Sequence, residues 1–117
     1  NPADQLRDKF QSFEQYIGPR VADFPGLEIE LSRLSAVMSH DLRNEVRRIT
    51  ARTLVLGAAD DQLTPAGFQR ELTTRIPGAE LHIFETGGHF FPILQAAAYN
   101  ERVKRFLLAA PREAAAA

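Results

Sequence analysis

Apolar residues in the first part of the chain recur at the spacing of amphipathic helices. In residues 3–17 they follow intervals of four, three and four, which places one stripe on one helical face: Leu6, Phe10, Phe13 and Ile17. The segment "GPR", residues 18–20, predicts the end of this helix. A second helix is expected after Pro25-Gly26, with an apolar stripe made of Leu27, Leu31, Leu34 and Met38. A short third helix is expected to turn three apolar residues inward: Leu42, Val46 and Ile49.

The pattern changes after residue 48. "RTLVLG", residues 52–57, is a compact apolar run ended by glycine, which is typical of a strand buried on both faces of a parallel sheet. Residues 64–76 predict a helix with Thr64 as its N-cap and Pro65 in its first turn. Pro77-Gly78 is expected to end that helix. Its apolar stripe consists of Phe68, Leu72 and Ile76.

A second strand, a loop and a last helix follow. "ELHIFE", residues 80–85, predicts the strand, and "GGHFFP", residues 87–92, predicts the loop. The last helix is expected over residues 95–108, with core positions at Ala98, Val103, Phe106 and Leu107. A strand–helix–strand order predicts parallel strands joined by a right-handed crossover. Because two buried strands do not make a stable sheet alone, we expect the chain to be part of a larger α/β domain.

Composition narrows the class of protein. The 117 residues suit one domain, and 44% of them are hydrophobic, which allows a core. A net charge of −1 argues against nucleic acid as a partner. No apolar run reaches the roughly 20 residues that span a bilayer, and the start lacks the features of a secretory signal, so no membrane partner is expected. With no cysteine, we expect no thiolate zinc site and a reducing, cytoplasmic location.

Polar side chains that can carry chemistry follow both predicted strands. Asp60 and Asp61 come after the first strand, and His89 comes after the second. The carboxyl ends of parallel strands gather at one edge of the sheet, where ligands bind, and neighbouring strands lie about 4.8 Å apart. A carboxylate there could fix the tautomer of the histidine, which would act as a general base. The two glycines before His89 would give its loop unusual backbone angles.

Other interpretations of these residues stay open. An acidic pair in a loop is usually a solvated turn or a helix cap, and a histidine beside two phenylalanines is often a packed surface residue. Only one aspartate can face His89, so we expect Asp60 to be structural. His40, at a predicted helix end, and His82, on the alternate face of a strand, have no such setting and receive no function.

Taken together, residues 49–107 resemble the C-terminal part of an α/β-hydrolase. The likeness is closest to the branch with 3-oxoadipate enol-lactonase-like and related esterase members. In that family a strand of the type P-T-L-V-I ends in G-x-x-D-x-(L/V)-T-P, a second strand leads to a G-G-H-F loop, and a helix closes the domain. Here these segments are "RTLVLGAADDQLTP", "GGHF" and "LQAAAYNERVKRFL". The resemblance implies that Asp61 is the triad acid and His89 the triad base.

The resemblance also implies a division of the chain. Residues 1–48 correspond to the helical cap or lid, residues 49–109 to the C-terminal part of the core, and residues 110–117 to a flexible tail. Four lid residues are candidates to line a substrate pocket or simply to pack the lid onto the body: Phe10, Phe13, Leu34 and Met38. The residues that bind substrate are otherwise unknown.

The family's nucleophile motif, G-x-S-x-G, is absent from these 117 residues. In the family it precedes the lid, and the serines present here all lie on predicted helices: Ser12, Ser32, Ser35 and Ser39. We therefore expect a partner that carries the N-terminal half of the hydrolase, either as a separate polypeptide or as the other product of a cleaved precursor. Smaller departures are Ala58 in place of the family's glycine, and Leu94 and Ala96 after the histidine.

The function that the resemblance implies is hydrolysis of an ester or lactone in a small apolar substrate, without a metal or organic cofactor. The nucleophile is expected to be Ser, with Asp or Cys as alternatives. A second hypothesis is a catalytically inactive α/β-hydrolase-like binding protein that retains Asp61 and His89 as relics. A third is an independent small α/β interaction domain, which the exposed strand edges disfavour.

Overall fold

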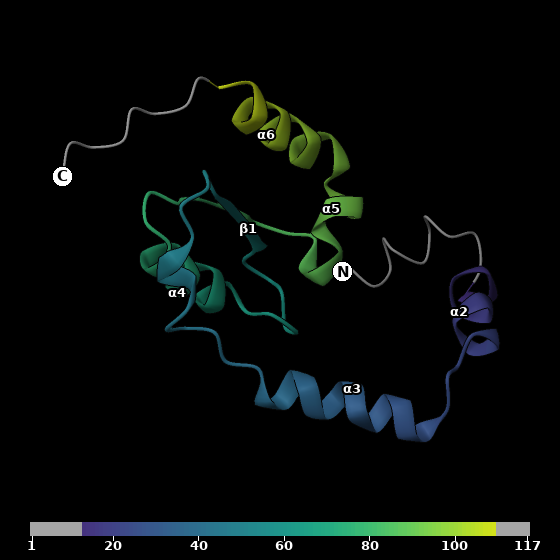
Figure 1. The fold of residues 1–117 in the computed structure, drawn as a ribbon. Coiled ribbons are helices and arrows are strands. Elements are labelled where there is room, and N and C mark those ends of the chain that lie inside the picture. The colour runs from purple at the N-terminus through teal and green to yellow at the C-terminus, as the bar shows by residue number, and fades with distance from the viewer. Residues whose placement is uncertain (1–12, 110–117) are drawn as a thin grey trace. The chain divides into compact units, whose positions relative to one another are not determined.

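The computed structural model describes residues 13–109, with side chains from Gly18 onward (Figure 1). The chain divides into two units, a helical unit that ends at Leu42 and a strand-containing unit that begins at Arg43. None of the helices in this described range is long and apolar enough to cross a membrane.

The helical unit contains α2 (Phe13–Ala22) and α3 (Leu27–Ser39). The prediction that the first helix ends at "GPR" is wrong, because α2 continues through Pro19 to Ala22. Proline removes one N–H from the helix, but its own carbonyl still accepts a hydrogen bond, here from the Asp23 amide at 3.0 Å. The start of this predicted helix, with Leu6 and Phe10, lies outside the described residues.

Helix α3 forms where the sequence predicts it and ends at Ser39, with His40 as its C-cap. None of its residues is buried, and the predicted stripe is exposed along its whole length, with Leu34 56% accessible to solvent. The predicted third helix is only a single 3-10 turn, η1 (Val46–Arg48). Its i→i+3 hydrogen bonds do not keep the helical period, so Val46 is half-buried while Leu42 and Ile49 are exposed, contrary to expectation.

The strand-containing unit is built on a parallel pair, β1 (Leu54–Ala58) and β2 (Glu80–Phe84), joined by α4 (Ala66–Arg75). The predicted α/β class and parallel pairing are confirmed, and Figure 1 shows α4 beside β1. Gly57 does not end the first strand as predicted, because it pairs with Ile83 inside the sheet. A Cβ at this position would lie 2.9 Å from the Gln69 side chain, so glycine allows α4 to pack closely on β1.

Helix α4 buries one end of its predicted stripe. Ile76 is buried and Leu72 half-buried, but Phe68 is 62% exposed, so the described residues leave this end of the stripe uncovered. Gly78 ends the helical segment with a φ of +71°, as expected of a glycine stop. The N-cap position is held by Pro65 and not by Thr64, whose hydroxyl bonds to a carboxylate instead.

The predicted loop at residues 87–92 is largely helical. It forms the 3-10 turn η2 (Gly88–Phe90) and the short helix α5 (Phe91–Leu94), which α6 (Ala96–Leu108) follows. The reason is local: Gly87 turns the chain with a φ of +116°, and Pro92 suits a first helical turn. In α6, the predicted core positions Val103 and Phe106 are half-buried. The other two predicted core positions, Ala98 and Leu107, are exposed.

The core lies between β1, β2 and the helices beside them. Its buried apolar residues are Val55, Ala58, Ile76 and Phe84. Phe84 stacks on Phe91 of α5 with ring centroids 5.3 Å apart, and Tyr99 of α6 lies 6.5 Å from the Phe84 ring. An ion pair between Arg102 and Glu80, 2.9 Å long, further ties α6 to β2. These contacts fasten both ends of β2 to the two helices that follow it.

Candidate active site

Asp61 lies in the turn that follows β1, and its carboxylate is fully engaged. Its Oδ1 accepts hydrogen bonds from the amides of Leu63 at 2.9 Å and Thr64 at 3.0 Å. Its Oδ2 accepts one from the Thr64 hydroxyl at 2.8 Å. The side chain is only 2% exposed, so these bonds replace the water that burial removes.

The environment of Asp61 favours the ionised carboxylate. Burial acts to raise its pKa, and hydrogen bonds from Thr64, His89 and Leu63 act to lower it. The hydrogen bonds outweigh burial, so the pKa of Asp61 lies below its ordinary value of 3.8. At neutral pH, Asp61 is therefore an anion that only accepts hydrogen bonds.

His89 lies in η2, the turn that follows β2, and faces this anion. Its Nδ1 is 3.1 Å from Asp61 Oδ2, and its ring packs edge-on to the Phe90 ring. Because a carboxylate cannot donate, Nδ1 carries the proton in this pair. The side chain is 43% exposed, which leaves the other ring nitrogen, Nε2, as the one able to take a proton from a neighbouring group. The Thr64 hydroxyl oxygen is 3.5 Å from Nδ1, a longer and weaker contact.

Asp60 binds main chain instead of the imidazole ring. Its Oδ1 accepts a hydrogen bond from the Gly88 amide at 2.8 Å, and its Oδ2 accepts one from the Gly87 amide at 3.3 Å. Two adjacent aspartates on the β1 turn thus hold the same β2 turn, one through its backbone and the other through the His89 ring.

The structure brings together the residues that the sequence singled out. Asp61 and His89 are in hydrogen-bonding contact, while their catalytic role remains a prediction. His40 is the exposed C-cap of α3, and His82 packs its edge against Phe84 with ring centroids 4.6 Å apart. Thr64 is the one site residue that the sequence pattern predicted wrongly, as a helix cap. Its place three residues after the acid, in the T-P of the family's motif, was the available signal.

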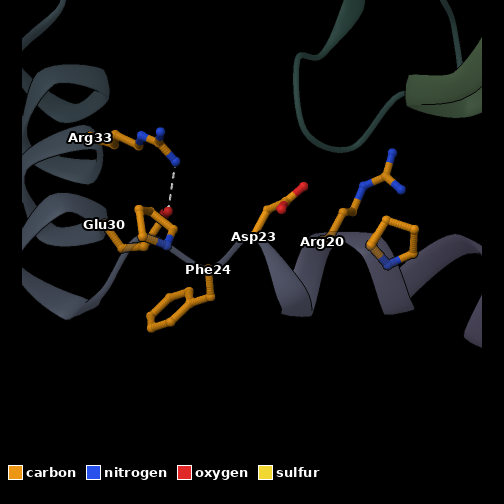
Figure 2. Close-up of a pocket in the computed structure, with 7 residues that line it drawn as sticks. Arg20, Asp23, Phe24, Glu30 and Arg33 are labelled. Carbon is orange, nitrogen blue, oxygen red and sulfur yellow. Dashed lines mark hydrogen bonds and ion pairs between the residues drawn. The ribbon is translucent and has the colours of Figure 1, made fainter.

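A separate open hollow of about 600 Å³ lies in the helical unit, at the junction of α2 and α3 (Figure 2). An ion pair from Arg33 to Glu30, 2.7 Å long, crosses one side of it. Neither Asp61 nor His89 lines this hollow. It is lined by Pro19, Arg20, Asp23, Phe24, Pro25, Glu30 and Arg33.

Comparison with known proteins finds one matching family and several related hydrolases. A family model described as "TAP-like protein", of the α/β-hydrolase class, matches residues 34–116. The protein named "Putative carbamate hydrolase RutD" of Caulobacter segnis is 31% identical over 106 residues, which are 91% of this chain and 40% of the relative. The protein of the same name from Yersinia enterocolitica is 34% identical, over 92% of this chain and 38% of the relative. The chain therefore spans about 40% of the length of these curated relatives.

Solved structures agree on the fold. An esterase from Exiguobacterium antarcticum superposes with a TM-score of 0.60 at 27% identity, covering 63% of this chain and 28% of the esterase. A lipase-esterase related protein from Clostridium acetobutylicum superposes with a TM-score of 0.64, covering 89% of this chain and 44% of that one. At 23% identity, the second likeness concerns the fold alone.

Proposed function

The chain belongs to the TAP-like family of α/β-hydrolases, and from that premise we propose that it supplies the acid and the base of a hydrolase for a small-molecule ester, lactone or carbamate. The observation that carries this proposal is the 3.1 Å contact between His89 Nδ1 and a buried, ionised Asp61. The names of the relatives and the esterase among the structural neighbours support the bond type.

The proposed chemistry follows from the two nitrogens of His89. Asp61 fixes the Nδ1–H tautomer, so Nε2 takes the proton of a nucleophile hydroxyl as that oxygen attacks the acyl carbon. The protonated ring, stabilised by Asp61, then gives the proton to the leaving group. An acyl-enzyme remains. His89 next takes a proton from water, whose oxygen attacks the acyl carbon, and returns that proton to the nucleophile oxygen.

We further propose that the nucleophile lies on an N-terminal segment outside these 117 residues, in the same or a separate polypeptide. The sequence contains no G-x-S-x-G motif. Ser32, Ser35 and Ser39 lie within α3, where the Ser39 hydroxyl bonds to the Ser35 carbonyl at 2.8 Å. The relatives are more than twice as long as this chain, which leaves room for such a segment.

A serine-directed fluorophosphonate tests both statements on the complete protein. We expect one covalent label, on a residue outside these 117, found by mass spectrometry of the labelled peptides. We expect His89→Gln and Asp61→Asn each to slow labelling and ester hydrolysis by about 10³- to 10⁴-fold, because either change removes the oriented base. The matched control His40→Gln, on an exposed cap, should keep the wild-type rate.

Other outcomes have defined meanings. A His89→Gln protein that hydrolyses at the wild-type rate would refute the assigned base. A label within these 117 residues would refute the external nucleophile. If the protein is not labelled and hydrolyses none of the ester, lactone and carbamate probes, the inactive binding protein is favoured. Comparing kcat/KM among these three probes, matched in size, would identify the preferred bond.

A further inference from the structure

Two consecutive glycines before His89 present their amides to a single anion. Gly87 and Gly88 both have positive φ, +116° and +53°, and both are buried. Successive N–H groups in such a conformation form a small concave site that favours negative charge. Buried N–H groups also need a partner, because leaving one unsatisfied is costly.

The anion in this site is the carboxylate of Asp60. It spans both amides, with Oδ1 on Gly88 and Oδ2 on Gly87, and it comes from the turn that also carries Asp61. Gly88 is the first residue of η2, and its carbonyl accepts a hydrogen bond from the Phe91 amide that closes the turn. The position of Gly88 therefore sets the direction from which His89 approaches Asp61.

We propose that Asp60 is a positioning residue for catalysis, which holds the Gly87–Gly88 backbone so that His89 keeps its contact with Asp61. This inference rests on the proposed role of His89 as the base. The two adjacent aspartates act on different groups, since Asp61 orients the ring and Asp60 fixes the backbone that carries the ring. The hydrogen bonds of the Asp60 carboxylate go to backbone amides and not to the ring.

The test compares three variants of the complete protein, with kcat and KM measured per fluorophosphonate-titrated site. Asp60→Ala leaves both amides without a partner, and we expect kcat to fall by about 10- to 100-fold with KM little changed, since small misplacements of a catalytic group are costly. Asp60→Asn can still accept from Gly88 through its amide oxygen, so it should recover part of the loss. Glu85→Gln removes one nearby exposed charge and should have no effect.

A second arm repeats the aspartate variants in a His89→Gln background. A residue that acts through His89 should cause no further loss there, whereas a general structural defect should cause the same loss in both backgrounds. The proposal is overturned if Asp60→Ala keeps kcat within about two-fold of wild type, or if the losses are additive. If Asp60→Ala does not fold, Asp60→Asn decides by the same criteria. A wild-type rate in His89→Gln alone would instead refute the proposed function.

Discussion

Helix α3 in the helical unit and the β1–α4–β2 segment in the strand-containing unit both carry regular apolar patterns. In α3 every residue of the stripe is exposed, and the ion pair on this helix, Arg33 with Glu30, lies at the surface. In the strand-containing unit the apolar positions meet a sheet, and Val55, Ile76 and Phe84 are buried. Periodicity therefore specifies which face is apolar, but burial needs a second surface to cover that face.

This contrast predicts that stability depends mainly on the strand-containing unit. Phe84→Ala should have the largest effect, about 3 to 5 kcal/mol in the free energy of unfolding, because Phe84 is 7% exposed and stacks on Phe91. Urea unfolding of the protein measures it. Phe68→Ala is the matched control, since it removes an equal ring that is mostly exposed. Equal losses for the two variants would contradict the burial seen here.

Replacing a glycine by alanine should change the stability of the protein in opposite directions in the two units. At Gly87, with a φ of +116°, a Cβ would lie 2.8 Å from Phe91, so Gly87→Ala should destabilise the protein by about 1 to 3 kcal/mol. At Gly18, inside α2, a Cβ meets nothing within 4 Å, so Gly18→Ala should stabilise by about 0.5 to 1 kcal/mol. Thermal unfolding of both variants compares them. A Gly87→Ala protein as stable as wild type would show that this turn is not strained.

Thr64→Val should lower the free energy of unfolding and change how that free energy depends on pH. The loss of one hydrogen bond to a buried carboxylate costs about 1 to 2 kcal/mol at neutral pH. Because the folded-state pKa of Asp61 is lowered, its carboxylate stabilises the fold above the ordinary pKa of 3.8, and this stabilisation is lost as pH falls through the folded-state pKa. Without the Thr64 hydroxyl the folded-state pKa lies closer to the ordinary value, so the stability lost on acidification should be smaller and should be complete at a higher pH. Unfolding free energies between pH 2 and 7, roughly spanning the titration of aspartate, test this. Thr74→Val, on exposed α4 surface, is the control.

The smallest change in the free energy of unfolding is expected for a substitution on α3. Leu34→Ala should change the free energy of unfolding by about 1 kcal/mol or less, because more than half of this side chain is already exposed. This small difference can be measured from the urea unfolding midpoints of the variant and the wild type, provided that the slopes of the two transitions are the same. A loss as large as that of Phe84→Ala would mean that another surface covers the α3 stripe in the complete protein.

Much of the strand-containing unit follows from local sequence. Local signals predict β1, α4 and β2 to within a few residues. These signals are the apolar run at residues 52–57, the helix start at Pro65, the helix stop at Pro77-Gly78 and the alternation at residues 80–85. The motif residues also predict that an aspartate and a histidine meet at the ends of the strands. Errors occur where local signals conflict, as at Pro19, which α2 accommodates, and at residues 87–92, where helical turns follow a glycine.

By itself, the sequence determined α3, β1, α4, β2 and α6 to within a few residues, and that Asp61 and His89 lie at the carboxyl ends of neighbouring strands. Only the tertiary structure decided that Asp60 binds the backbone amides of Gly87 and Gly88, and that Thr64 serves Asp61 and not α4. The physical reason for the Asp60 contacts is that a hydrogen bond depends on distance and direction between groups 27 and 28 residues apart, which the parallel pairing of β1 and β2 sets and no local pattern encodes.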